Sequence, residues 1–451
     1  MVQLRAGYQW RSGMKLRICG ALLAAVSAYG QMPGYGGPGV ASRGAQAGNR
    51  GTEPVSIRPY ANVMGFVDNG MLGVGLTETG ELVNPGAMYG VEAGIGAYGS
   101  KSWRRSQVGL DYQGNYRHYT KNTFFNGSDH ILGLNYTTQA TRRVSYQLGV
   151  FAGVTSRTVG GNFINGLLAP QFLGTTQFDV FDNRAYFLNA TGQTTIQVGA
   201  RNYVSMSGSG FAVRRRSSAL VGLNGQLASG SFGRQVNRKT TLGVQYQYFH
   251  VDYPRVFGEA DSMMLALQVS RQIGRLWNLT LSAGAIRTDF SGVRVVTVDP
   301  VVAELFGVTT GREAFNSINT VPQTTISVSR GLRRGSFSMS YSRGVNPGNG
   351  ALLLSRQETM GGAYSYNTAN KWSFSVTTNY SRFNGLGNYN DRLNFLMGGV
   401  IASRQLTDDV HFVSGFDVRR ADVSSAVFQR VSTRFSVGFA YSPGELPLSL
   451  R

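Results

Sequence analysis

The sequence predicts an all-β chain whose strands close into a transmembrane antiparallel up-and-down β-barrel of about 18 strands, with 16 as the next choice. Charged residues make up only 15% of the 451 residues, well under the roughly 25% of soluble domains. Aromatic residues reach 11%, which excludes a disordered chain. Downstream of the N-terminus we find no apolar run of about 18 residues, the length that a membrane-spanning helix needs.

The N-terminal segment has the pattern of a secretory signal peptide. Lys15 and Arg17 precede an apolar run over residues 18–28, and small residues follow before Gln31. The single cysteine, Cys19, lies inside this segment, so we expect a mature chain without disulfides or thiolate metal sites. Either Met1 or Met14 would be the start. The expected organisation is a signal peptide over 1–30, a Gly/Pro-rich flexible segment over 31–53 and the β-barrel over 54–445.

Period-two alternation dominates the rest of the chain. In residues 144–155, Leu148 and Val150 alternate with Gln147 and Gly149, and Phe151 is the one apolar exception on the polar face. The same alternation recurs at 242–248, 336–342, 372–377 and 435–441. The polar face consists of Ser, Gly, Gln, Asn and Thr, whereas the polar face of a soluble sheet usually carries many Lys and Glu.

Strand length favours the membrane. These segments run for about ten residues or more, as a tilted bilayer-crossing strand requires, and strands in soluble proteins average about 5 to 6 residues. Lipid cannot hydrogen-bond an open sheet edge, so the strands must close into a barrel. Aromatic residues toward the segment ends predict interfacial girdles: Tyr112, Tyr116, Tyr136, Tyr248, Trp372 and Tyr380.

Short polar or basic turns fix the expected topology. Eight of them join sixteen strands: Gly99 to Arg105, Ala140 to Arg143, Val198 to Asn202, Gln235 to Lys239, Gln272 to Arg275, Gly331 to Gly335, Thr368 to Lys371 and Gln405 to Asp409. A first strand at Arg58 to Val67 and a last one at Thr433 to Tyr441 give eighteen, with both termini on the periplasmic side. The longest outer loops, Val159 to Asp182 and Gly292 to Thr320, would either fold into the lumen as a constriction or cap the outer rim.

The chain resembles the outer-membrane β-barrel porin families of Gram-negative bacteria, including barrels linked to exopolysaccharide secretion. The resemblance rests on Phe181 to Arg184, Gly210 to Arg216, Tyr246 to Tyr253, Tyr341 to Val345 with Gly348 to Gly350, and the ending Tyr441 to Leu450. It implies a barrel in the outer membrane and transfers no catalytic residue. Many such barrels end on an aromatic residue, whereas here about ten residues follow Tyr441.

Motifs for catalysis or cofactor binding are nearly absent. The four histidines are scattered without metal-ligand spacing. His250 and Asp252 share one strand face, and a barrel-borne hydrolase could use such a pair with a serine. A histidine at such a position more often lies at the membrane interface than takes part in catalysis. We expect no cofactor, no metal and no enzyme activity.

The formal charge of +20 falls to +16 when residues 1–30, with four basic and no acidic residues, are removed. Arginine pairs at turns would contact anionic lipid headgroups, and no basic stripe on a soluble fold points to nucleic acid. Inward arginines would instead give the pore a positive field. The expected pore-lining residues are Gln113, Arg117, Gln147, Arg157, Gln245, Gln247, Arg419 and Arg434.

These features predict a porin-like channel in the outer membrane of a Gram-negative bacterium, passing small polar and, given inward arginines, anionic solutes by passive diffusion. Its partners would be outer-membrane lipid and those solutes, without nucleic acid. One alternative is the outer-membrane component of an exopolysaccharide export system, which would need periplasmic export partners. The other is a barrel-borne hydrolase.

Overall fold

The computed structural model describes most of the chain after residue 54. The described residues are 55–69, 86–121, 125–155, 184–218, 220–256, 258–297, 304, 307, 309–348, 353–367, 371–386, 392–423, 428–443 and 446–448. The predicted signal peptide and flexible segment lie outside them. Among the described residues, no helix has the length and apolar character to cross a membrane.

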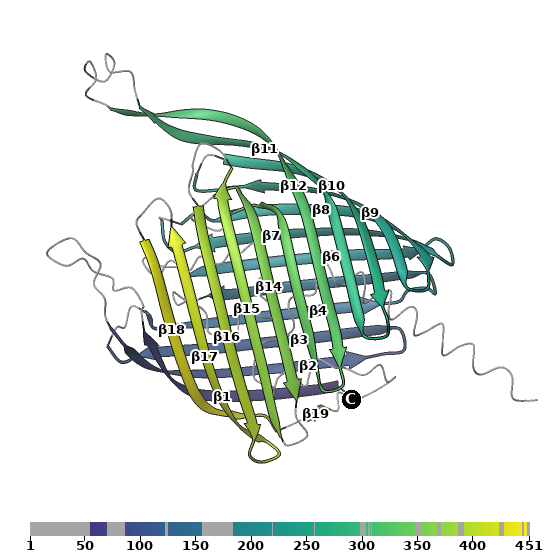
Figure 1. The fold of residues 1–451 in the computed structure, drawn as a ribbon, viewed down its shortest axis with the longest axis vertical. Helices are drawn as coiled ribbons and strands as arrows, with labels where there is room; N and C mark the ends of the chain where they lie inside the picture. The colour runs from purple at the N-terminus through teal and green to yellow at the C-terminus, as the bar shows by residue number, and fades with distance from the viewer. Residues whose placement is uncertain are drawn as a thin grey trace, which may run out of the picture.

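The fold is a closed antiparallel β-barrel (Figure 1). Each strand pairs with the next in sequence, and the first strand, β1, also pairs with β18 to close the ring. The predicted count of 18 barrel strands is confirmed. The strands are β1 (Val55–Asn69), β2 (Met88–Ser102), β3 (Ser106–Tyr119), β4 (Gly127–Thr138), β5 (Val144–Thr155), β6 (Ala185–Gln197), β7 (Asn202–Arg215), β8 (Leu223–Asn237), β9 (Thr240–Asp252), β10 (Gly258–Ile273), β11 (Trp277–Thr297), β12 (Thr310–Leu332), β13 (Gly335–Asn346), β14 (Ser355–Asn367), β15 (Trp372–Gly385), β16 (Arg392–Gln405), β17 (Val410–Val423) and β18 (Phe428–Tyr441), with a short β19 (Leu446–Leu448).

The two ends of the barrel differ in their connections. At one end, the turn end, all eight predicted short turns are found, for example residues 103–105 between β2 and β3 and residues 333–334 between β12 and β13. The other end, the loop end, carries the remaining connections. Both β1 and β18 meet the turn end, where Ala61 pairs with Tyr441. The ends of the first and last strands lie within about five residues of the predicted ends. Because all eight turns are where the sequence predicts them, the short turns determine the order of the strands.

Alternation separates two faces on every strand. On β5, Leu148 is 53% exposed on the outer face, and Gln147 and Gly149 face the lumen. The register carries this division from strand to strand around the ring, because a paired residue always shares the face of its partner. The outer face is an exposed apolar band that includes Val244 and Phe435, as lipid contact requires.

The predicted loop Gly292 to Thr320 is mostly strand. Strands β11 and β12 extend beyond their neighbours as a paired ribbon at the loop end (Figure 1). Strand β12 pairs with β13 only from Thr324 onward. Pro322 lies two residues closer to the loop end than Thr324, where β12 has no pairing with β13. Proline cannot donate a backbone hydrogen bond, so it is tolerated on this unpaired edge of β12. The described parts at residues 292–297 and 310–320 therefore form a strand ribbon rather than a coil. The other predicted long loop, 159–182, lies outside the described residues.

The residues after Tyr441 extend the seam of the barrel. Strand β19 pairs with Val55–Ile57 of β1, on the same edge that β18 uses further along. The Ser442 hydroxyl also donates to the Pro59 carbonyl oxygen over 3.4 Å. The unusual ending therefore adds backbone pairing where the first and last strands meet.

Epitope tags should report this topology in intact cells. Tags inserted at Thr141 or Arg333 lie in short turns and should be hidden from antibodies, because short turns of such barrels face the periplasm. A tag placed after Thr297, at the tip of the β11–β12 ribbon, should be labelled. Surface labelling at Thr141 or Arg333 would invert the assignment of the two ends.

Candidate functional site: the lumen

Toward the turn end, small polar side chains line the lumen. They form hydroxyl and amide contacts between neighbouring strands: Gln193 Nε2 donates to Ser205 Oγ over 3.0 Å, and the hydroxyls of Ser207 and Ser229 lie 2.7 Å apart. At these positions, the strands carry small hydroxyl groups rather than large side chains, and the larger Tyr203 lies beyond them over Gly233. On these strands, this half of the lumen wall is polar.

Four predicted lining residues are glutamines, and all four lie on the lumen face. Gln147 is exposed, and Gln245 and Gln247 are half-buried. Gln113 is buried on β3. The register pairs Gln147 with Gln193 and Gln247 with Ser229, so these glutamines continue the polar lining from strand to strand.

Toward the loop end, the lumen face becomes apolar. A buried cluster joins inward residues of β4, β6, β7, β9 and β11, including Ile131, Phe187, Phe211, Val251 and Phe290. Phe151, the exception to the alternation, is partly buried and packs against this cluster. Its apolar side chain belongs on the lumen face because that face is no longer polar at this depth.

Short connections meet over the loop end of this cluster. Leu354, just before β14, packs in the same cluster as Val251 of β9, although four strands lie between β9 and β14 in the ring. The Tyr253 hydroxyl, after β9, donates to the Pro347 carbonyl oxygen, after β13. Arg255 Nη1 donates to the Ser217 carbonyl oxygen over 3.1 Å. Three connections thus converge, and they narrow the lumen at its loop end.

Burial affects the proton of one of these donors. Desolvation raises the pKa of the Tyr253 hydroxyl well above its usual range. The shift reinforces a proton that an ordinary tyrosine already holds at physiological pH, so the hydroxyl is available to donate to Pro347.

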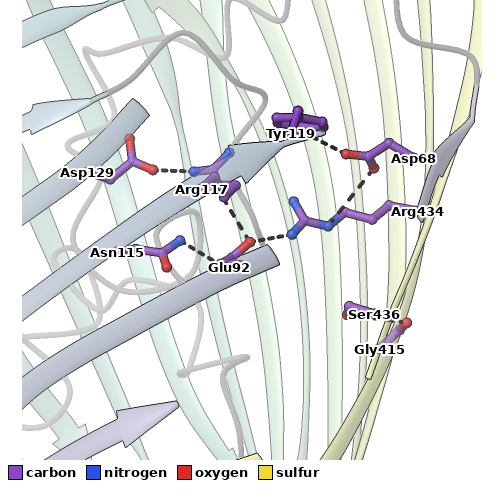
Figure 2. Close-up of polar contacts among 9 residues, drawn as sticks. All are labelled: Asp68, Glu92, Asn115, Arg117, Tyr119, Asp129, Gly415, Arg434 and Ser436. Atoms are coloured by element: carbon purple, nitrogen blue, oxygen red, sulfur yellow. Dashed lines mark hydrogen bonds and ion pairs between the residues drawn. The ribbon is translucent and has the colours of Figure 1, made fainter. Parts of the chain in front are cut away.

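At the same end, a network of charged side chains lies inside the barrel (Figure 2). We call it the charge network: Asp68 of β1, Glu92 of β2, Arg117 of β3, Asp129 of β4 and Arg434 of β18. Arg117 binds Asp129 and lies 3.6 Å from Glu92. Arg434 binds Glu92 and lies 4.0 Å from Asp68.

Neutral groups complete the charge network. Asn115 Nδ2 donates to Glu92 Oε1 over 2.7 Å, and the Tyr119 hydroxyl donates to Asp68 Oδ2 over 2.7 Å. The guanidinium of Arg434 also lies 4.1 Å from the centre of the Phe66 ring, a favourable cation–π distance. The members of the network come from β18 and from β1 to β4. The network therefore links the two sides of the seam, where β1 pairs with β18.

Glycines on β2 make room for this arrangement. Gly90 and Gly94 flank Glu92 on the lumen face. A Cβ at Gly94 would collide with the Asn62 side chain, and one at Gly90 with the Phe66 ring. Without side chains there, neighbouring groups lie directly over the β2 backbone, and Glu92 can be reached from both sides.

The predicted basic lining is therefore different from an open positive surface. Arg117 and Arg434 face inward as expected, but their side chains are 0% and 4% exposed and paired with carboxylates. Arg419 is buried as well. Arg157 lies outside the described residues. The sequence located the arginines on the lumen face but missed the acidic partners that neutralise them.

The candidate hydrolase pair does not form. His250 Nδ1 lies 3.0 Å from Asp261 Oδ1 of β10, and Asp252 accepts a hydrogen bond from Asn224. Both are on the outer face, because their neighbour Val251 faces the lumen cluster. Within the described part of the chain, no group of three or more His, Cys, Asp or Glu side chains could hold a metal ion.

No protein-family model and no curated protein sequence matches the chain. Among solved structures, it is similar to Pseudomonas aeruginosa OccK2 (OpdF) in complex with glucuronate, with 12% identity, a TM-score of 0.41, and coverage of 87% of this chain and 100% of that chain. It is also similar to a BenF-like porin from Pseudomonas fluorescens Pf-5, with 9% identity, a TM-score of 0.42, and coverage of 87% and 99%. Acinetobacter baumannii OccAB1 matches with 9% identity, a TM-score of 0.40, and coverage of 88% and 99%.

Proposed function

We propose that the protein is a passive channel for small polar solutes in the outer membrane of a Gram-negative bacterium. The observation that supports this most strongly is the solvent-exposed Gln147 on the lumen face of a closed wall whose outer face is apolar. Side chains that point inward yet remain exposed leave space for water, and solutes can diffuse through a polar, hydrated lumen.

The channel would discriminate between solutes at the loop end of the lumen. There, the lumen face carries both the apolar cluster around Phe211 and the charge network, and the two adjoin on β4, where Ile131 is two residues from Asp129. A solute must pass a surface that attracts apolar groups and a surface whose charges already satisfy one another. Any anion preference must then come from residues other than Arg117 and Arg434, because neither guanidinium reaches the open lumen.

Liposome swelling tests the proposed activity. Vesicles containing the refolded protein should swell in solutions of small uncharged sugars, and the rate should fall as the sugar becomes larger. Vesicles prepared with heat-denatured protein are the control. Equal rates for the two preparations would contradict a passive channel.

The loop-end constriction can be widened by one substitution. Phe211→Leu removes part of a buried ring from the cluster and should increase both the swelling rate and the single-channel conductance, at a stability cost below about 1.5 kcal/mol. Phe232→Leu is the matched control on β8, because Phe232 lies on the outer face and is exposed. Unchanged conductance in Phe211→Leu would place the constriction elsewhere.

Neither alternative function gains support from the described residues or from the comparisons. An exopolysaccharide exit component would require periplasmic partners and would stay closed without them. Swelling by the isolated protein therefore distinguishes a channel from such a component.

A further inference from the structure

Three arginines gather on the outer face of β13, β14 and β15, close to the loop end. We call Arg343, Arg356 and Arg382 the arginine patch. In the register, Arg343 pairs with Glu358, and Glu358 pairs with Arg382. Arg356 is two residues from Glu358 on the same face of β14. The three side chains therefore occupy adjacent positions on neighbouring strands.

The arginine patch lies directly beyond the apolar band. On the same outer face, Tyr341, Met360, Tyr380 and Leu396 form one row of paired residues from β13 to β16. Two residues further toward the loop end, the row becomes Arg343, Glu358, Arg382 and Asn394. An apolar band ends where the hydrocarbon ends, so the arginine patch stands at the depth of the lipid headgroups.

Several donors of the arginine patch are buried without a hydrogen-bond acceptor. The Nε atoms of Arg343, Arg356 and Arg382 have none within the described structure, and neither does Nδ2 of the neighbouring Asn384. Glu358 is the one carboxylate within the two rows of the patch, and it lies 3.6 Å from Arg343. Buried donors without an acceptor cost free energy, and an anion with several oxygens would satisfy them together.

The outer face at the loop end is less basic on β8, β9 and β10 than at the arginine patch. On β8, β9 and β10, the outer face at the loop end carries Asn224, Asp252 and Asp261, with His250 between them. A bound anion would be repelled there and attracted by the arginine patch.

We propose that the arginine patch binds the phosphate of an anionic lipid in the leaflet at the loop end. The phosphate accepts hydrogen bonds from the arginines, which match phosphate geometry, and the acyl chains lie along the row of Tyr341, Met360 and Tyr380. Because the apolar row adjoins the arginines, a lipid fits this surface better than a soluble phosphate. The inference rests on the membrane position proposed above.

The experiment measures lipid binding by the purified full-length barrel in detergent, using native mass spectrometry and thermal unfolding. A bisphosphorylated glycolipid (lipid A), its dephosphorylated form and inorganic phosphate are added separately. The wild-type protein should bind and be stabilised by the phosphorylated lipid above the other two. Arg343→Gln, Arg356→Gln and Arg382→Gln combined should weaken its binding by more than about tenfold, a change of about 1.4 kcal/mol, because the charge-assisted donors to the phosphate are lost.

Matched controls separate the possible outcomes. Arg333→Gln with Arg334→Gln changes the same residue type at the turn end and should leave lipid binding unaltered. Arg382→Gln alone serves if the combined variant does not fold. Equal binding of the dephosphorylated lipid, or equal stabilisation by inorganic phosphate at the same concentration, would overturn the proposal in the wild-type protein itself. Conduction is not part of this readout, so a protein that binds the lipid but does not conduct would contradict only the channel.

Discussion

Arg117→Gln should lower the free energy of unfolding by about 3–5 kcal/mol, because removing one partner of a buried ion pair leaves the other charge uncompensated. Arg117 is 0% exposed and binds Asp129, with Glu92 also near. Glutamine can donate hydrogen bonds but carries no charge. Urea unfolding of the refolded barrel in detergent micelles, followed by tryptophan fluorescence, measures the change.

Two further variants make this result specific. Arg333→Gln removes the same charge from an exposed turn residue and should change stability by less than about 0.5 kcal/mol. Combining Arg117→Gln with Asp129→Asn should cost less than the sum of the single changes, because the two residues interact. A cost for Arg117→Gln no larger than that for Arg333→Gln would show that the charge network does not stabilise the seam.

Leu148→Arg should cost about 2–4 kcal/mol, the penalty for arginine on the lipid face near the bilayer midplane. Leu148 is exposed on the outer face of β5. Its neighbour Gln147 is exposed on the lumen face, so Gln147→Arg should assemble with nearly normal yield. Heat-modifiable mobility in electrophoresis and the yield of folded barrel in the outer membrane measure both variants.

Leu148→Arg and Gln147→Arg introduce the same residue on the same strand at nearly the same depth, so they differ mainly in the face that carries the arginine. Val244→Arg and Gln245→Arg on β9 repeat it on another strand, where Val244 is exposed on the outer face. If arginine lowered the yield of folded barrel equally on both faces, the outer face would not contact lipid while the lumen face contacts water.

The barrel itself could be predicted because its determinants are local. Alternation on each strand and eight short turns are properties of neighbouring residues, and they fix strand number, order and the sidedness of residues such as Leu148 and Gln147. The register then follows, since a one-residue slip would turn every side chain to the opposite face.

The loop-end constriction could not be predicted in the same way. Its residues are apolar on a face that the sequence analysis treated as polar throughout, and Phe151 was left as an exception. A signal was present on β9, where the lumen face changes from Gln245 and Gln247 to the apolar Phe249 and Val251. The partner segments, such as Leu354, lie far away in sequence, so only the folded ring brings them together.

The charge network was missed for a related reason. The sequence placed Arg117 and Arg434 on the lumen face, yet Glu92 and Arg434 are 342 residues apart in the chain. Their contact depends on the closure of β1 against β18. A strand-by-strand reading gives the direction of each side chain and does not give its partner across the seam.

The central claim is that the face carrying Gln147 lines a water-filled path. Single-channel recording in planar bilayers tests it most directly, with Gln147→Cys and Leu148→Cys introduced into a chain that lacks Cys19, the single native cysteine. The wild-type protein should conduct, and a bulky water-soluble thiol reagent should reduce the current through Gln147→Cys while leaving Leu148→Cys unchanged. A wild-type protein that does not conduct, or a Gln147→Cys current that the reagent does not alter, would contradict the account.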